Sequence, residues 1–207
     1  MKIIAHRGND GIHKENSLEA IINSLNKKYV DGVELDVRLT KDKKLIINHD
    51  PFYNGYYINN TNAVKLQRLG LNMLDEILIN ISNNKIIMIE VKVDDKQIKQ
   101  MTKKLIKTLN KYKLNYYICS FNYNFLINFK KCCHIKAGLI ISIKINTKHI
   151  NNNFDFNSIN ILYNKKIPNK ETFRWTVNTK KELEKVNKNE NVITDNPLEI
   201  YKITQQS

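Results

Sequence analysis

Short apolar runs of strand length recur along the whole chain and alternate with segments of helical periodicity. The runs cover nine ranges: 2–6, 32–37, 45–49, 85–91, 115–121, 136–143, 158–163, 172–177 and 191–195. Between most of them, apolar residues recur at the spacing of a helix that buries one face. This periodicity predicts helices over 17–25, 71–79, 98–109 and, in a shorter form, 180–186. Alternating strands and helices indicate an α/β fold with a parallel sheet.

One pair of runs breaks the alternation. Only residues 38–44 separate the run at 32–37 from the run at 45–49. A parallel crossover needs about a dozen residues or more, whereas an antiparallel hairpin closes with far fewer. We therefore expect a hairpin that turns around Lys41-Asp42-Lys43 and returns beside the preceding strand. The eight remaining runs suggest a short TIM (β/α)8 barrel, with this extra antiparallel strand after the second barrel strand.

The length of 207 residues favours one domain over 1–207, at the short end of the range for such barrels. Some connecting helices must then be short or missing, above all between 121 and 172, where the chain is rich in Asn and Lys and its periodicity is weak. Residues 53–62 are polar and aromatic, and they indicate an exposed loop or a small insertion.

Composition narrows the class of protein only slightly. No apolar stretch approaches the roughly 20 residues of a membrane-spanning helix, and the start at Met1-Lys2-Ile3-Ile4 leaves no room for a signal peptide before His6. The three cysteines include an adjacent pair, which does not suit a disulfide framework and indicates reduced thiols. We therefore expect a cytoplasmic protein.

The net charge of +14 and the pI of about 9.6 leave three interpretations open. The chain can bind nucleic acid, contact an anionic membrane surface, or carry a lysine-rich composition of no direct function. Lysines are scattered rather than clustered, and Asn and Ile are equally abundant, which fits AT-rich coding. We expect no specific nucleic acid partner, at most a weak contact with an anionic membrane surface, and faster encounter with anionic substrates. The oligomeric state is left undetermined.

Polar residues at strand ends carry the candidate chemistry. Glu34 and Asp36 lie two apart on a predicted strand and so share a face, and Glu90 and Lys92 repeat this arrangement on another strand. Alternating surface charge explains the first pair alone. In a barrel, however, three carboxylates converge near the mouth and form an oxygen-rich site suited to Mg²⁺ or Ca²⁺.

Two histidines and two positively charged side chains add to these candidate site residues. His6 and His49 each close an apolar run and are candidates for general acid and base. Arg7 offers a planar fork to phosphate oxygens and Lys92 a point charge. Trp175 either lines the pocket or packs within the barrel. Three other histidines lack such a setting and receive no role: His13, His134 and His149.

Taken together, these motifs resemble those of the glycerophosphodiester phosphodiesterase family. They follow the family order over nearly the whole chain, from residue 3 to about 200: His6-Arg7-Gly8, Glu15-Asn16-Ser17, Glu34-Leu35-Asp36, His49-Asp50, Glu90-Val91-Lys92, Ser120-Phe121, Trp175-Thr176-Val177-Asn178 and Thr194-Asp195-Asn196-Pro197. The segment at 51–69 is short for the family, and residues 122–170 match its pattern poorly.

The resemblance implies a small-molecule phosphodiester substrate and roles for the matching residues. Glu34, Asp36 and Glu90 would hold one divalent cation, Mg²⁺ or Ca²⁺. His6 and His49 would act as acid and base, while Arg7, Lys92 and Trp175 would contact the substrate. The implied reaction is metal-dependent hydrolysis of glycerophosphodiesters to glycerol 3-phosphate and an alcohol, with water or a neighbouring glycerol hydroxyl as the attacking group.

Two alternatives remain. A phosphodiesterase of the lysophospholipase D type would need an apolar path beside the pocket. A non-catalytic basic barrel would instead bind anionic lipid or nucleic acid, but such a protein is expected to have lost at least one histidine or metal ligand. None is lost here, which favours the enzyme.

Overall fold

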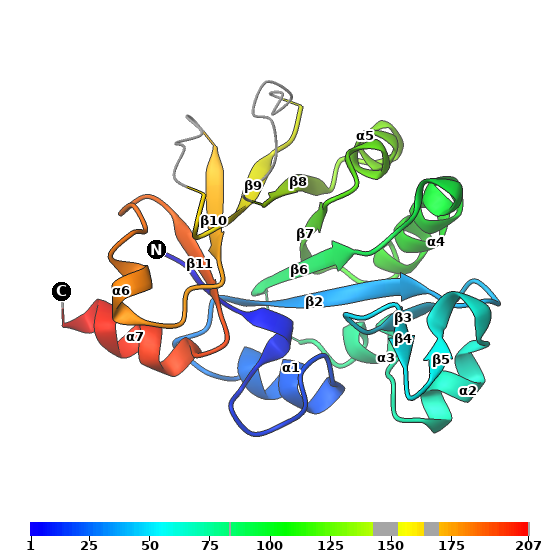
Figure 1. Cartoon of the computed structure of the whole chain (residues 1–207), viewed down its shortest axis with the longest axis horizontal. Coiled ribbons are helices and arrows are strands. Elements are labelled where there is room, and N and C mark those ends of the chain that lie inside the picture. The colour runs from blue at the N-terminus through cyan, green and yellow to red at the C-terminus, as the bar shows by residue number, and fades with distance from the viewer. Residues whose placement is uncertain (83, 143–152, 164–169, 207) are drawn as a thin grey trace.

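Eight parallel strands close into a barrel (Figure 1). The structure is a computed structural model that describes residues 1–82, 84–142, 153–163 and 170–206. The barrel strands are β1 (Ile3–Ala5), β2 (Gly32–Leu39), β6 (Ile86–Val91), β7 (Asn115–Ser120), β8 (Lys136–Ile141), β9 (Phe156–Asn160), β10 (Glu171–Trp175) and β11 (Asn191–Thr194). The first strand, β1, pairs with both β2 and β11, which closes the ring and confirms the predicted barrel.

The predicted extra strand is also present. Strand β3 (Leu45–Ile47) pairs antiparallel with the end of β2, and Leu39 lies opposite Leu45. The turn between them is held by the Thr40 hydroxyl, which donates to Asp42 at 2.7 Å. Lys43 takes a left-handed conformation with φ 61° and brings the chain back. This return places the segment after β3 beside the end of β2.

Helices surround the barrel on its outer side. They are α1 (Leu18–Leu25), α2 (Ala63–Arg68), α3 (Leu74–Leu78), α4 (Ile98–Leu109), α5 (Tyr123–Cys132), α6 (Lys180–Leu183) and α7 (Pro197–Gln205). Short 3₁₀ turns lie at η1 (His6–Gly8), η2 (Ile58–Asn60) and η3 (Asp95–Gln97). The four helices predicted from periodicity are all present, and α4 has the predicted bounds.

The stretch after 121 differs in part from expectation. A helix of ten residues, α5, follows β7, although weak periodicity predicted short or missing helices there. The Asn122 side chain caps it by accepting from the Phe125 amide at 2.9 Å, and Phe125, Leu126 and Phe129 form its buried face. No helix occurs among the described residues between β8 and β10, so the prediction holds for that part.

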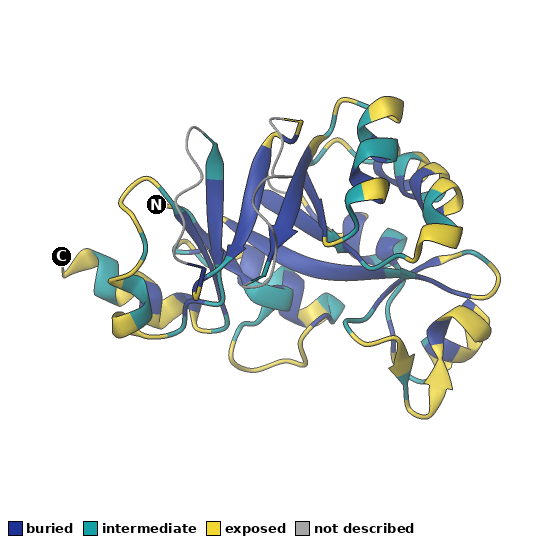
Figure 2. Ribbon diagram, turned by 45° about the horizontal axis from the view of Figure 1, so that its top comes forward, coloured by how far each residue is buried: buried dark blue, intermediate teal, exposed yellow. Residues whose placement is uncertain are grey.

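The insertion after β3 is small and exposed, as predicted. It contains a hairpin of β4 (Phe52–Tyr53) and β5 (Tyr56–Tyr57), followed by η2. Figure 2 shows this hairpin as an exposed projection, whereas the barrel strands are almost entirely buried. The hairpin therefore contributes surface near the site and little of the core.

The core has two layers, one inside the barrel and one between the strands and the helices. Inside the barrel, the Phe156 and Phe173 rings meet edge to face at 5.7 Å. Gly138 leaves room for them, because a Cβ there would lie 2.5 Å from the Phe156 ring. These rings fill the barrel interior beneath its mouth. No helix in the described part of the chain is long and apolar enough to cross a membrane.

Candidate active site

A cavity of about 320 Å³ lies at the mouth formed by the carboxyl ends of the barrel strands. We call it the barrel cavity. Strand-end positions of this kind form the active sites of TIM-barrel enzymes. The structure brings seven of the eight predicted site residues to its wall: His6, Arg7, Glu34, His49, Glu90, Lys92 and Trp175. The eighth, Asp36, lies beneath the wall and is 1% exposed.

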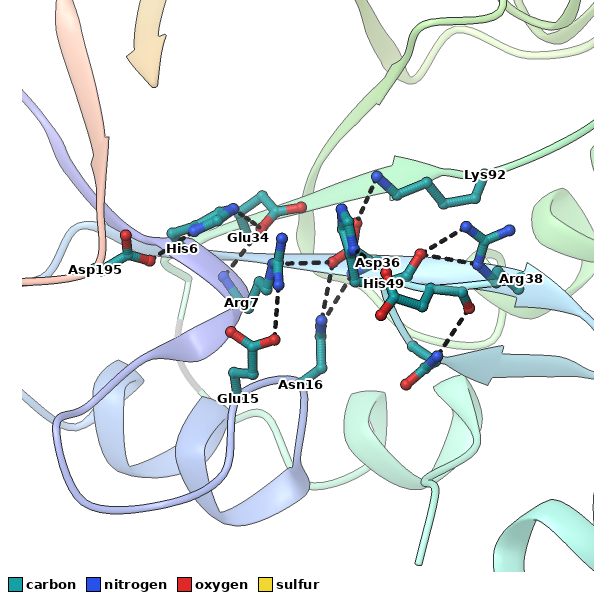
Figure 3. Close-up of polar contacts among 12 residues, drawn as sticks. His6, Arg7, Glu15, Asn16, Glu34, Asp36, Arg38, His49, Lys92 and Asp195 are labelled. Carbon is teal, nitrogen blue, oxygen red and sulfur yellow. Dashed lines mark hydrogen bonds and ion pairs between the residues drawn. The ribbon is translucent and has the colours of Figure 1, made fainter. Parts of the chain in front are cut away.

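Three carboxylates converge from two adjacent strands, and Figure 3 shows two of them, Glu34 and Asp36 of β2. Glu34 and Asp36 point to the same side of β2, and Asp36 lies opposite Glu90 of β6 in the parallel register. One oxygen from each carboxylate falls within 4.8 Å of the others. The Lys92 ammonium forms ion pairs with Glu90 and, at 3.2 Å, with Asp36. Lys92 therefore links two of the three carboxylates.

Burial and mutual repulsion destabilise the ionised form of these carboxylates. Burial and the neighbouring Asp36 charge raise the pKa of Glu34 to about 8. The same two causes raise the pKa of Glu90, although Lys92 opposes them. Within the described residues, the buried Glu34 Oε1 has no hydrogen-bond partner. An unpartnered oxygen in an acidic, oxygen-only group fits a hard divalent cation.

Arg7 joins the cluster through both its backbone and its side chain. Its backbone N–H donates to Glu34 Oε2 at 3.0 Å, and its guanidinium donates to Glu15 at 2.6 Å. The Arg7 Nε also lies 3.6 Å from Asp36. This geometry requires φ 52° at Arg7 and φ 65° at Gly8, where a Cβ would come within 2.5 Å of Ile21. Gly8 therefore allows the tight turn that aims Arg7 at the acids.

His6 lies between two carboxylates at the end of β1. Its Nδ1 is 2.7 Å from Asp195 Oδ1, and its Nε2 is 4.0 Å from Glu34. Burial lowers the pKa of His6, but the hydrogen bond to Asp195 and the Glu34 charge outweigh it and raise the pKa above its ordinary value. Asn178 holds Asp195 in place, since its amide donates to Asp195 Oδ2 at 2.7 Å.

His49 approaches the cavity from the segment after β3. Its Nδ1 lies 2.8 Å from Asp50, and its side chain is 39% exposed. Arg38 fixes the backbone by donating two hydrogen bonds to the His49 carbonyl, at 3.0 and 2.6 Å. The hydrogen bond to His49 also lowers the pKa of Asp50. His6 and His49 thus line one cavity, and each imidazole is paired with a carboxylate of its own.

Trp175 combines the two arrangements predicted for it. Its ring lines the barrel cavity, packs against the barrel-interior cluster and meets Phe121 edge-on at a centroid distance of 6.1 Å. Neither of the other two described histidines, His13 and His134, lines the barrel cavity. His13 pairs with Asp10 in an exposed loop at 2.6 Å, and His149 lies outside the described residues.

Several residues around the site were not among those predicted. Asp195 follows the last apolar run, so the strand-end criterion applied to the others was sufficient to find it. Asn16 belongs to the Glu15-Asn16-Ser17 motif, but the sequence does not indicate which group its side chain contacts. Its amide nitrogen donates to Asp36 at 2.9 Å, while its oxygen accepts from the Asp36 backbone at 3.1 Å. This two-sided clasp is visible only in three dimensions.

Comparison with known proteins identifies relatives over nearly the full length. The sequence model of the glycerophosphoryl diester phosphodiesterase family matches residues 6–155. A glycerophosphodiester phosphodiesterase of Caldanaerobacter subterraneus subsp. tengcongensis is 27% identical, with 94% of each chain covered. A further glycerophosphodiester phosphodiesterase, from Bacillus altitudinis, is 47% identical over 53 residues, which cover 26% of this chain and 21% of that protein.

Solved structures share the architecture. A glycerophosphodiester phosphodiesterase of Thermotoga maritima is 25% identical, with a TM-score of 0.79 and coverage of 99% of this chain and 97% of the other. A phosphodiesterase of Oleispira antarctica, solved with the product sn-glycerol-3-phosphate, is 20% identical with a TM-score of 0.85, and covers 100% of this chain and 97% of its own. The second likeness shows the barrel fold alone.

Proposed function

Since the chain belongs to the glycerophosphoryl diester phosphodiesterase family and is a phosphoric diester hydrolase of that class, we propose that it releases sn-glycerol 3-phosphate and an alcohol with the help of a divalent cation and two histidines. The observation that carries this proposal is the meeting of three carboxylates within 4.8 Å on a cavity that His6 and His49 also line. The carboxylates that would bind a cation and the two histidines that would transfer protons thus face the same cavity.

The chain's own groups account for substrate binding. Arg7 and Lys92 supply positive charge to the phosphate oxygens, the first as a planar fork and the second as a point charge. Lys92 is already held by Asp36 and Glu90, and burial opposed by these two carboxylates leaves its pKa raised. Lys92 therefore stays charged at neutral pH and is fixed in position before the substrate arrives.

Glu34, Asp36 and Glu90 would hold the cation. When bound, Mg²⁺ or Ca²⁺ supplies Lewis-acid polarisation and neutralises charge on the phosphoryl group. The unpartnered Glu34 oxygen and the excess of carboxylates over ammonium groups support this assignment. The three carboxylates keep one another in reach because β2 and β6 are paired in register.

The two histidines would move the protons. One removes a proton from the attacking oxygen, which is water or a glycerol hydroxyl of the substrate, and the other protonates the departing alcohol oxygen. Where the glycerol hydroxyl attacks, a cyclic phosphate forms, and water then opens it to give glycerol 3-phosphate. Asp195 orients the His6 ring and Asp50 the His49 ring through bonds of 2.7 and 2.8 Å to Nδ1. In both rings the other nitrogen, Nε2, is then left to exchange a proton with the substrate.

Release of glycerol 3-phosphate from glycerophosphocholine and glycerophosphoethanolamine tests the proposal, measured with Mg²⁺, with Ca²⁺ and with EDTA. We expect release with a cation and none with EDTA. Release that persists in EDTA would contradict the role of the carboxylates, and no release under any condition would contradict the proposed reaction.

A further inference from the structure

A second cavity of about 440 Å³ adjoins the barrel cavity. We call it the side cavity. The two share three wall residues, Glu90, Lys92 and Phe121. A phosphate held at Lys92 therefore lies at the junction, and the two groups esterified to it can extend in different directions.

We propose that the side cavity receives the alcohol part of the substrate and selects a small alcohol with an ammonium group, which the Asp94 carboxylate binds. This inference rests on the proposed function, because it assigns the second half of the same substrate. Asp94 lies directly after β6, two residues beyond Lys92, and forms part of the side-cavity wall.

The walls of the two cavities are built from different elements, and this difference indicates which half of the substrate each cavity binds. The barrel cavity is floored by strand residues such as Met88, Cys119 and Ile140, whose positions are set by the sheet. The glycerol half is common to all glycerophosphodiesters and suits this fixed space. The side cavity is walled mainly by segments that follow strands, within 51–59, 92–97 and 121–122. Specificity is commonly carried by loops on a rigid scaffold.

Among the described residues, Asp94 is a carboxylate of the side-cavity wall that has no ion pair. Lys92 is bound by Glu90 and Asp36. Arg38 lies on the same wall and its charge acts on Asp94, but it donates its hydrogen bonds to the His49 carbonyl. Among the described residues, the exposed Asp94 side chain makes no hydrogen bond or ion pair, and it does not cap the turn that follows it. Asp94 is thus a carboxylate at the cavity wall that is available to a ligand.

Phe121 adds a surface that a cation can approach. Its side chain is 47% exposed at the junction of the cavities, and its ring centroid lies 6.0 Å from the Lys92 ammonium. Aromatic faces attract ammonium groups, including quaternary ones. The wall also carries polar side chains at Asn59, Gln97 and Asn122, which suit the polar surroundings of a small amino alcohol.

The test compares kcat/KM for glycerophosphoethanolamine and for neutral glycerophosphoglycerol in the wild type and in Asp94→Asn. We expect the substitution to lower kcat/KM about three- to tenfold for the ammonium substrate, and less than about twofold for the neutral one, as for a partly exposed ion pair. Asp95→Asn is the matched control. It removes the same charge from a neighbour outside the cavity wall and keeps an oxygen to accept from Asn122.

Equal losses for both substrates, or an equal effect of Asp95→Asn, would overturn the proposal. A binding measurement distinguishes failure of the proposed Asp94 subsite from failure of the proposed reaction. Calorimetry with glycerophosphoethanolamine and Mg²⁺ on the His49→Ala background measures affinity without turnover. A weaker affinity in the added Asp94→Asn variant would support the subsite even if the wild type released no product, and an unchanged affinity would refute it.

Discussion

At the scale of single residues, the candidate site is dominated by paired and unpaired charge. Each histidine has a carboxylate partner, and Lys92 has two. Burial and the neighbouring Asp36 charge raise the pKa of Glu34 to about 8. The ionised form of the acidic cluster is therefore stabilised most by an added positive charge. The two histidines depend instead on the carboxylates that orient their rings.

His49→Ala is expected to lower turnover by about 10²- to 10⁴-fold, the usual contribution of a general acid or base, while leaving the fold intact. The His49 ring is half-exposed and bonds only to Asp50 among the described residues, and the backbone carbonyl that Arg38 binds is retained. Steady-state rates and circular dichroism measure the two effects. His13→Ala is the matched control, since His13 makes the same kind of pair with Asp10 away from the cavity. Near wild-type rates for His49→Ala would contradict its acid–base role.

Glu90→Gln is expected to weaken divalent-ion binding by at least about tenfold, because it removes one charge from the proposed ligand set. Titration calorimetry with Mg²⁺ and Ca²⁺ gives the affinity. Glu171→Gln provides the comparison, since Glu171 is a strand carboxylate paired with Lys2 at the amino end of β10, away from the cluster. An affinity unchanged in Glu90→Gln, or equally reduced in both variants, would argue against Glu90 as a ligand.

The residue types at the site could be predicted because strand alternation and strand ends are visible in sequence. Glu34, Asp36, Glu90 and Lys92 follow a two-residue period that places them on one face. The contacts that hold these residues in place could not be predicted from the sequence. The Asn16 clasp on Asp36 and the hold of Arg38 on the His49 carbonyl depend on loop paths that no periodicity encodes.

At the scale of elements, strands were predicted more completely than helices. Each barrel strand overlaps a predicted apolar run, since strands buried on both faces favour apolar sequence, although β9 and β10 also carry polar residues. Helices α2, α5 and α7 were missed because their apolar residues are few or interrupted by Asn and Lys. Their ends are set instead by local contacts, such as the Asn122 cap of α5.

The short turn η1 links the first strand to the site, and Gly8 determines its shape. Gly8→Ala is expected to lower the free energy of unfolding by about 2–4 kcal/mol, combining the left-handed conformation with overpacking against Ile21. Urea unfolding measures the loss, and activity is expected to fall because Arg7 moves with the turn. Gly11→Ala separates the two causes, since Gly11 also has positive φ but open space around its Cβ position. It should lose only about 1–2 kcal/mol. Equal losses would show that Ile21 does not constrain the turn.

At the scale of the whole molecule, the barrel gathers distant segments at one mouth. His6 near the amino end and Asp195 near the carboxyl end are 189 residues apart in sequence, yet they are hydrogen-bonded because β1 pairs with β11. Closure of the barrel therefore completes the His6 site. It also buries the acidic cluster, which couples the stability of the whole fold to the protonation of that cluster.

This coupling predicts how stability depends on pH. Glu34 has an ordinary pKa of 4.5 and a raised pKa of about 8 in the folded protein, so folding retains its proton between these values. Without a cation, the free energy of unfolding should therefore fall as pH rises from about 5 to 8, by at most about 1.4 kcal/mol per pH unit for one group. His6 acts in the same direction, because its pKa is also raised on folding and its stabilisation is lost as pH rises through that value.

A bound cation should reverse this trend, because it requires the carboxylates to be ionised and stabilises the folded state by about 2.7 kcal/mol at a concentration one hundred times its Kd. Denaturant unfolding from pH 5 to 9, in EDTA and in excess Mg²⁺, measures both curves. Glu34→Gln should flatten the EDTA curve, since it removes the titrating group while keeping the side-chain shape. A slope in EDTA that Glu34→Gln leaves intact would assign the pH dependence to other groups. Loss of the difference between the EDTA and Mg²⁺ curves in that variant would identify the acidic cluster as the point where cation binding, protonation and barrel stability are linked.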